Sequence, residues 1–194
     1  SLERALTDEL RRLAAEHQLT LNTFVQAAWA LVVSDFSSDL AVVFGAVRAS
    51  RRNGLPEAES MVGMFITTLP MRTRVDAQAP VLAWLSALRA SQVAGRAVEQ
   101  TPLVDIQACS EVPKGSGLFD SVIVYNDLSM GSRMRQLGGA YEQRDFAWLE
   151  QTNSPVTLFG YGEPELLLKI SFDPAKVSKQ RAELMLARAL RALE

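Results

Sequence analysis

The stretch MVGMFITTLPMR, Met61 to Arg72, decides the predicted fold. It reads as a strand-like run of apolar residues that carries two adjacent threonines, a proline near its end and a final arginine. Because successive side chains of a strand point to opposite faces, Thr67 and Thr68 are expected to present their hydroxyls to opposite faces. Pro70 cannot donate a hydrogen bond to a neighbouring strand. The stretch therefore predicts a strand that ends at Pro70 or lies at the edge of a sheet.

Amphipathic segments on both sides of this stretch predict helices. The first, over 7–17, begins at a capping Thr7, with Asp8 and Glu9 in its first turn, where they suit the helix dipole. The second begins at Thr20, a third occupies 80–95, and a last one closes the chain. Apolar residues at the i, i+3, i+4 spacing predict a buried stripe on the second helix: Leu21, Phe24, Val25, Ala28, Trp29 and Val32. The last helix carries Leu184, Leu190 and Leu193.

Short apolar runs rich in valine and leucine predict further strands. They occupy 40–47 and 118–125, and two more within 155–172 form a predicted hairpin joined through Gly160 to Pro164. A polar loop is expected from Arg48 to Ser60, and 139–148 fits a strand or a loop. Helices and strands that alternate in this way indicate one α/β unit.

Composition narrows the class of protein. The 194 residues are 48% apolar and 22% charged, which describes one globular unit with a real core. A net charge of −2 without a block of like charges gives no electrostatic footprint for nucleic acid or an anionic membrane. Cys109 is the only cysteine and no signal peptide is recognisable. We therefore expect a cytoplasmic protein with no nucleic acid or membrane as partner.

The sequence nominates no catalytic group of its own. His17, the only histidine, falls at the end of the first predicted helix, where a surface position explains it. Nucleophile, phosphate-binding, dinucleotide-binding and zinc motifs are missing. The acidic pairs Asp35/Asp39 and Glu163/Glu165 read as ordinary loop charges. We expect no metal site, no tightly bound cofactor and no catalytic residue within this chain.

A family resemblance becomes specific over residues 42–72. The sequence VVFGAVRASRRNGLPEAESMVGMFITTLPMR resembles, without a gap, the pattern VFGxxxSGRxxxLPxxExMVGxFxNTLPxR of condensation domains in nonribosomal peptide synthetases. Four further segments are similar to the family in the same order: AAEHQLTLNTFVQAAWALVVS, EQTPLVDIQACS, LFDSVIVYND and TNSPVTLFGYGEPELLLKISFD. The related epimerisation and heterocyclisation domains carry different residues where this chain reads GMFITTLP. The resemblance covers nearly the whole chain.

The resemblance implies a chloramphenicol-acetyltransferase-like lobe, a mixed β-sheet with helices packed on it. In the family, two such lobes form a V around a tunnel that carrier-protein phosphopantetheine arms enter, and a peptide bond forms between a donor thioester and an acceptor aminoacyl thioester. The family's base lies in an HHxxxDG motif of the N-terminal lobe, and this sequence has no such motif. We therefore expect residues 1–194 to be the C-terminal lobe alone, inactive by itself. The alternative is a non-catalytic module of the same fold that binds carrier proteins.

The resemblance also nominates site residues. The candidates for the tunnel wall are Gly63, Phe65, Thr67, Thr68, Leu69, Arg72, Tyr125 and Asn126. One threonine hydroxyl is expected to face the tunnel, although the family usually has asparagine at Thr67, so a two-donor amide becomes a single hydroxyl. The segment 130–148 is expected to be a loop that bridges to the other lobe. The alternative for the threonines and Arg72 is a core strand with a polar exit.

Partner contacts are expected at a small basic cluster. Arg48, Arg51 and Arg52 stand together in a slightly acidic chain, and of the family's Ser-Gly-Arg only Arg51 is retained in register. Carrier proteins are acidic and bear a phosphopantetheine arm, so these arginines are candidates for contact with the carrier or its phosphate. A solvated run of loop charges is the alternative. The expected partners are an N-terminal condensation lobe, peptidyl or acyl carrier proteins and adjacent synthetase domains.

Overall fold

A mixed sheet organises the chain in the computed structural model, which describes residues 1–49, 57, 60–113, 115–146 and 152–194. Within these residues the sheet has five strands in the order β2-β1-β3-β4-β5. The strand β1 pairs antiparallel with β2 and parallel with β3, which pairs parallel with β4, and β4 pairs antiparallel with β5. The strands are β1 (Ala41–Ala49), β2 (Ile66–Arg74), β3 (Ser121–Asn126), β4 (Val156–Gly162) and β5 (Leu166–Phe172). This arrangement is the α/β fold with a mixed sheet that the resemblance implies.

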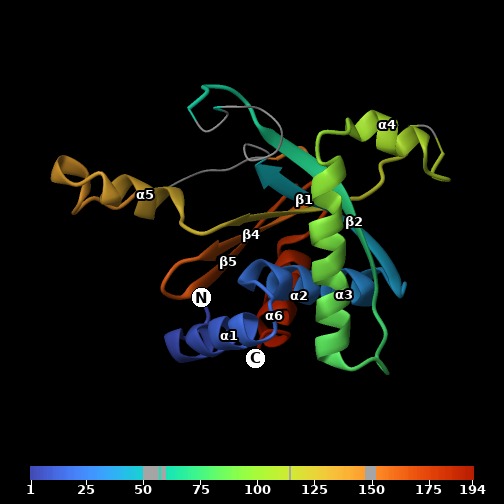
Figure 1. Cartoon of the computed structure of the whole chain (residues 1–194), viewed down its shortest axis with the longest axis horizontal. Helices are drawn as coiled ribbons and strands as arrows, with labels where there is room; N and C mark the ends of the chain where they lie inside the picture. The colour runs from blue at the N-terminus through green and yellow to red at the C-terminus, as the bar shows by residue number, and fades with distance from the viewer. Residues whose placement is uncertain (50–56, 58–59, 114, 147–151) are drawn as a thin grey trace.

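Helices from distant parts of the chain cover one face of this sheet (Figure 1). The covering helices are α1 (Arg4–Glu16), α2 (Leu21–Ser37), α3 (Val81–Ala94) and α6 (Lys179–Arg191). Shorter elements connect the strands: η1 (Gly95–Val98), α4 (Leu103–Ala108), α5 (Met130–Gln136) and η2 (Gly139–Tyr141). Figure 1 shows α5 projecting away from the packed helices, and none of its residues is buried.

The helix α2 forms the centre of the core. Thr20 caps it as predicted, because the side chain accepts a hydrogen bond from the Thr23 backbone N–H. Its stripe is buried against β1 and β4 from Phe24 to Val32, whereas Leu21 is half-buried, and Val25 and Trp29 are fully inaccessible to solvent. The Trp29 indole N–H donates to the Ser121 hydroxyl of β3 over 3.1 Å. A large aromatic side chain thus bonds the helix layer to the middle of the sheet.

Strand register assigns each side chain to one of the two faces. Phe44 lies opposite Met71 on the face toward the helices, and Val43 lies opposite Arg72 on the other face. Gly45 belongs to this second face, where a Cβ would stand 2.5 Å from the Phe119 ring. A side chain at position 45 has no room, so the glycine lets Phe119 lie directly on the strand.

The first helix differs from its prediction at its start. It begins at Arg4 with Glu3 as its N-cap residue, so Asp8 and Glu9 lie beyond the first turn. The Thr7 hydroxyl donates to the Glu3 carbonyl and accepts from the Leu166 backbone N–H over 3.0 Å. Thr7 is therefore a fully buried link between α1 and β5, and its prediction as a cap is wrong because a tertiary partner occupies the hydroxyl.

Other predicted boundaries also move. The strand β1 continues through Arg48 and Ala49, where the sequence predicts a loop, and β3 begins at Ser121. Both Gly160 and Gly162 belong to β4, so the hairpin turn consists of 163–165. The loop expected over 130–148 contains α5 and η2. On α6 the buried residues are Ala182, Met185 and Ala189, whereas Leu184 is exposed, because the helix turns a different face to β5.

Candidate functional site

A polar pocket of about 470 Å³ lies where β1 and β3 end. This is the carboxyl edge of the parallel strands, the place where open α/β sheets most often bind ligands. Side chains from the sheet edge, the first turns of α2, the helix α3 and η1 line it: Asn22, Gln26, Val47, Arg48, Ala49, Arg89, Gln92, Arg96, Glu99 and Asp127. Its walls are thus made mostly of amide, guanidinium and carboxylate groups.

A chain of hydrogen bonds fixes the wall of this pocket. The Gln92 amide N–H donates to the Gln26 side-chain oxygen over 3.0 Å, and the Gln26 amide donates to the Asn22 oxygen over 3.1 Å. The Thr23 hydroxyl donates to the Gln92 side-chain oxygen over 2.9 Å. The Arg48 guanidinium donates to the Gln92 backbone carbonyl over 2.8 Å. Because Gln26 and Gln92 are buried and paired, the network holds Arg48 in one orientation.

The charges in the pocket oppose one another. Burial lowers the pKa of the Arg48 guanidinium, Glu99 opposes this shift, and Arg96 and Arg89 add to it. Burial also lowers the pKa of Arg89, and Arg96 adds to that shift. Both arginines stay protonated at any ordinary pH. The lowered pKa values of Arg48 and Arg89 therefore reflect burial first, the neighbouring positive charges add to the shift, and Glu99 is a partial counter-charge to Arg48.

The two threonines lie on different faces of β2. Thr67 is directly opposite Arg48 in the strand register, on the face toward the helices. Thr68 is opposite Val47, and its methyl group lies on the second face, where a Cβ at Gly45 would meet it at 2.9 Å. Both side chains are partly buried. The two side chains therefore belong to different surfaces. Neither threonine lines the polar pocket, although Thr67 lies opposite Arg48, which does.

The remaining candidates on this strand spread along its length. Leu69 is buried, Phe65 is half-buried and Gly63 is exposed. Arg72 lies opposite Val43 near the amino end of β1, five residues from Thr67, so about 16 Å separates them along the strand. The structure does not bring Arg72 to the pocket. Of the basic cluster, only Arg48 can be placed, because Arg51 and Arg52 lie outside the described residues.

Tyr125 and Asn126 end β3 at the edge that holds the pocket. The Tyr125 side chain lies over two glycines of β4. A Cβ atom at Gly160 would stand 3.0 Å from the Tyr125 ring, and one at Gly162 would stand 2.4 Å from its hydroxyl oxygen. The ring packs against the core on the helix-covered face. Asn126 is half-buried and points to the other face by strand alternation.

Burial of Tyr125 predicts a loss of stability at high pH. Burial raises the pKa of its phenol to about 12, Asp127 adds to the shift and Arg11 opposes it. An unfolded tyrosine ionises near pH 10, so the stabilisation is complete below about pH 10 and is lost as the pH rises toward 12. Urea unfolding across this range should show a steeper loss for the wild type than for Tyr125→Phe. Parallel curves for the two proteins would contradict the prediction.

Most residues of the polar pocket could not be predicted from the sequence. Arg89, Gln92 and Arg96 are three and four residues apart on one side of the helix predicted over 80–95 and just beyond it. That spacing was a usable signal for a polar face. Nothing in the sequence indicates that this face meets Asn22 and Gln26, about 65 to 70 positions earlier, because the contact arises from packing of α3 against α2.

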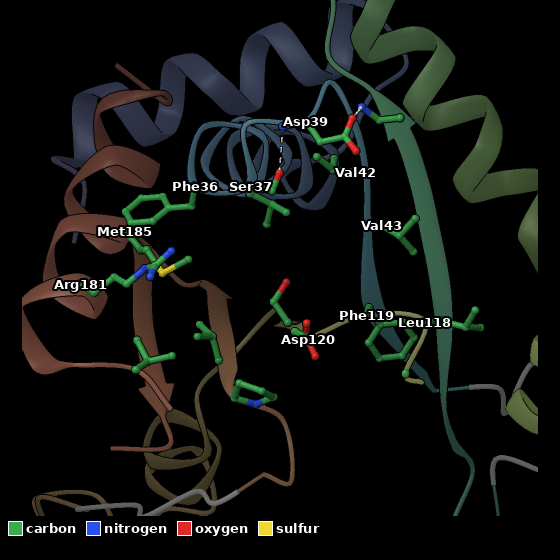
Figure 2. Close-up of a pocket in the computed structure, with 17 residues that line it drawn as sticks. Phe36, Ser37, Asp39, Val42, Val43, Leu118, Phe119, Asp120, Arg181 and Met185 are labelled. Atoms are coloured by element: carbon green, nitrogen blue, oxygen red, sulfur yellow. Dashed lines mark hydrogen bonds between the residues drawn. The ribbon is translucent and has the colours of Figure 1, made fainter. Parts of the chain in front are cut away.

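A second cavity, of about 400 Å³, opens at the opposite edge of the sheet (Figure 2). Figure 2 shows Asp120 and Arg181 on opposite sides of it, with Val42, Val43 and Met185 among the apolar lining. The guanidinium groups of Arg181 and Arg188 lie 5.1 and 5.2 Å from the centre of the Phe36 ring. This cavity is more apolar than the first and contains none of the predicted site residues.

Two kinds of feature do not occur in the part of the chain that the structure describes. No group of three or more histidine, cysteine or carboxylate side chains there is arranged to hold a metal ion. No helix among these residues combines the length and the apolar composition needed to cross a bilayer.

Solved structures identify the class of fold. The condensation domain from the monacolin K polyketide synthase MokA superposes with a TM-score of 0.76 at 16% identity, over 99% of this chain and 44% of that one. The first condensation domain of the CDA synthetase superposes with a TM-score of 0.73 at 17% identity, over 99% of this chain and 42% of that one. The fold is the chloramphenicol-acetyltransferase-like fold of condensation domains.

Sequence comparison identifies the family. The sequence profile of the condensation domain matches residues 1–184. Two polypeptides of the linear gramicidin synthase of Brevibacillus parabrevis are similar to this chain, one 41% identical over 99% of it and the other 39% identical over 93%. The chain belongs to the condensation domain family of nonribosomal peptide synthetases. It spans 4% and 2% of the length of these two relatives and less than half of the solved condensation domains above.

Proposed function

We propose that this chain is the C-terminal lobe of a peptide-bond-forming condensation domain. One observation carries the proposal: 99% of the chain superposes on solved condensation domains but covers only 42–44% of their length. The lobe supplies one wall of the tunnel in which a donor acyl group passes to the amine of an acceptor aminoacyl thioester. The HHxxxDG base belongs to the other lobe, so the chain alone does not catalyse the transfer.

An exposed apolar segment supports contact with a second lobe. Val62 and Met64 are almost fully exposed, and Ile66 is 61% exposed, at the start of the strand that carries Thr67 and Thr68. Contiguous apolar side chains on a surface mark an interaction site more often than scattered ones do. We assign this segment to the contact with the N-terminal lobe.

The carrier contact rests on the edge of the sheet that holds the polar pocket. Arg48 lines that pocket, and the proposed contacts at Arg51 and Arg52, which lie outside the described residues, are three and four positions later in the sequence. Basic side chains at this edge suit an acidic carrier and its phosphopantetheine arm. The arm acts as a substrate carrier, and the lobe holds no cofactor of its own.

Reconstitution tests the proposed function. The chain is joined to the N-terminal, HHxxxDG-containing half of the matching condensation domain from the 41% identical linear gramicidin synthase polypeptide, and donor and acceptor carrier thioesters are added. We expect dipeptidyl product from the joined protein and, from the chain alone, only the rate seen without protein. Product from the chain alone would contradict the assignment of the base. Carrier binding without product from the joined protein would favour the non-catalytic module instead.

A further inference from the structure

The second cavity lies far from the polar pocket, at the amino edge of β1, β3 and β4 (Figure 2). Its walls come from the end of α2, the first residues of these strands, the segment before β3 and the start of α6. Val42 of β1 lines this cavity and Arg48 lines the polar pocket, so about 20 Å separates the two along the strand. The proposed function gives the second cavity no role, so a ligand there is recognised independently of peptide-bond formation.

One side of the second cavity carries a guanidinium that lacks a counter-charge. Arg181 and Arg188 both lie over the Phe36 ring, at 5.1 and 5.2 Å from its centre. Arg188 also forms an ion pair with Asp35, whereas the Arg181 guanidinium forms no ion pair or hydrogen bond with any residue that the structure describes. Stacking on a ring uses the flat face of a guanidinium and leaves its in-plane N–H groups free. The donors of Arg181 are therefore available to a carboxylate.

The opposite side carries an acidic group that is also unpaired. Figure 2 shows Asp120 across the cavity from Arg181, and the two form no ion pair with each other. Asp120 is exposed, and its carboxylate accepts no hydrogen bond from any residue within the described part of the chain. Asp39, the other carboxylate of the lining, already accepts one from the Ala41 backbone N–H over 2.9 Å. Two unpaired charges of opposite sign thus lie on the two sides of the cavity.

Apolar side chains form most of the wall between these charges. Val42, Val156 and Met185 are buried there. Ser121, which is 8% exposed, also lines the cavity, and its hydroxyl accepts a hydrogen bond from the Trp29 indole N–H. This hydroxyl donates to no residue that the structure describes. Its proton is therefore available to a carbonyl oxygen of a ligand.

We propose that the second cavity binds a short apolar peptide with free ends, of which an apolar dipeptide is the smallest. The peptide carboxylate binds Arg181, its ammonium group binds Asp120, and its side chains contact the apolar wall. The two charges of a single α-amino acid are attached to one carbon atom, whereas those of a dipeptide stand at the ends of an elongated molecule. Because Arg181 and Asp120 lie on opposite sides, a ligand with separated charges fits them better. The volume of about 400 Å³ lies in the usual range for small organic ligands.

The charges of the lining disfavour simpler ions. Arg181 is the one cation of the lining, and Asp39 and Asp120 are its anions, so one positive and two negative charges give a net charge of −1. A simple carboxylate is repelled by the two aspartates, and a simple amine is repelled by the arginine. A zwitterion that places each of its charges beside the opposite one avoids both penalties.

Titration calorimetry of the 194-residue chain with a set of related probes tests the site. The probes are leucyl-leucine, its N-acetyl derivative without the ammonium group, its C-terminal amide without the carboxylate, and free leucine. We expect leucyl-leucine to bind about fivefold more tightly than each of the others, because each of them loses one charged contact. Glycyl-glycine keeps both charges but lacks apolar side chains, and it should bind at least about tenfold more weakly.

Charge variants assign each end of the peptide to its partner. Arg181→Gln should weaken leucyl-leucine binding about fivefold and should remove the preference over the C-terminal amide. Asp120→Asn should cause the same loss and should remove the preference over the N-acetyl derivative. Arg191→Gln makes the same charge change on the same helix but outside the cavity, and should leave every affinity unchanged. Because Asp120 has no side-chain partner among the described residues, Asp120→Asn should keep the wild-type melting temperature, which separates loss of binding from loss of fold.

Several results would overturn the proposal. Leucyl-leucine that does not bind at millimolar concentration would remove the site. Equal affinity for leucyl-leucine and its two derivatives would remove the charges as the recognised groups, and equal or tighter binding of free leucine would remove the peptide. An unchanged affinity in both Arg181→Gln and Asp120→Asn would place the binding outside the second cavity. None of these measurements uses a carrier protein or a product assay, so they fail or succeed independently of the proposed function.

Discussion

Trp29→Ala is expected to lower the free energy of unfolding by about 3–5 kcal/mol. The Trp29 side chain is fully buried between α2 and the sheet, and the substitution leaves a large cavity in the centre of the core. It also removes the donor to the Ser121 hydroxyl. Because small domains are stable by only about 5–15 kcal/mol, the variant should unfold at a much lower urea concentration than the wild type.

Matched substitutions separate packing from hydrogen bonding at this position. Trp29→Phe keeps much of the ring volume but leaves the buried Ser121 hydroxyl without its donor, at an expected cost of about 1–3 kcal/mol. The double variant Trp29→Phe with Ser121→Ala should recover part of that loss, because both polar partners are then gone. Urea unfolding of the wild type, Trp29→Phe, Ser121→Ala and the double variant gives the coupling energy between the two side chains directly. A loss below about 1 kcal/mol for Trp29→Ala would contradict the central position of this side chain.

Glu163→Ala is expected to release α5 from the body of the chain. One oxygen of the Glu163 carboxylate accepts a hydrogen bond from the Ser129 backbone N–H, and the other accepts one from the Ser132 hydroxyl over 2.8 Å. Ser129 is the N-cap residue of α5, and α5 has no buried residue to hold it otherwise. Loss of a charged acceptor should increase hydrogen exchange over 129–136 roughly tenfold. The global melting temperature should change little, because no core contact is lost.

The pH dependence of this exchange identifies the charge as the cause. Burial alone would raise the pKa of Glu163, but hydrogen bonds from Ser129 and Ser132, with Arg135 nearby, hold it below its usual value. The anchoring is therefore complete above the usual glutamate pKa of about 4.3 and is lost as the pH falls through the lowered value. Protection of 129–136, corrected for intrinsic exchange, should fall at acidic pH in the wild type.

Two control variants complete this experiment. Glu163→Gln should show reduced protection that does not vary with pH over the same range, because the amide has no charge to lose. Glu183→Gln, which alters an exposed Lys179 partner on α6, should behave as the wild type. Exchange over 129–136 that is the same in Glu163→Ala and the wild type would contradict the anchor.

The same hairpin turn is held from its other side. The Arg11 guanidinium of α1 donates to the backbone carbonyls of Gly162 and Pro164 over 3.2 and 3.3 Å, and also to that of Glu163. From the sequence, Glu163 reads as an ordinary loop charge. Its contact with Ser129 joins residues 34 positions apart, so it depends on where the β4–β5 turn lies and not on any local pattern.

The strong local patterns predicted the elements of the fold. The stripe from Phe24 to Val32 placed a buried helix correctly, and the Thr20 cap lies where the sequence put it. The predicted ends of helices and strands were wrong where a side chain bonds a residue distant in the sequence. Thr7 was predicted as a cap but bonds Leu166, and Arg48 was predicted in a loop but belongs to β1 and donates to the Gln92 carbonyl.

The candidate site divides in the same way. Sequence nominated Arg48, Thr67, Tyr125 and Asn126, and all four lie near the carboxyl edge of the sheet. The sequence could not show that Arg72 lies at the far end of β2 from them. Residues that are close in sequence are far apart in space when they belong to an extended strand. The sequence also could not show that Arg89 and Gln92 complete the pocket.

The sequence by itself determined the α/β class, the order of most helices and strands, and membership of the condensation family. These follow from periodicity, caps and a local motif, all of which act between residues near in the chain. The tertiary structure alone decided which helix face meets which strand, the hydrogen-bond network under Arg48, and the anchor of α5 at Glu163. Those features depend on packing and hydrogen bonds between residues 31 to 159 positions apart, and no local pattern encodes the partner of a side chain at such separation.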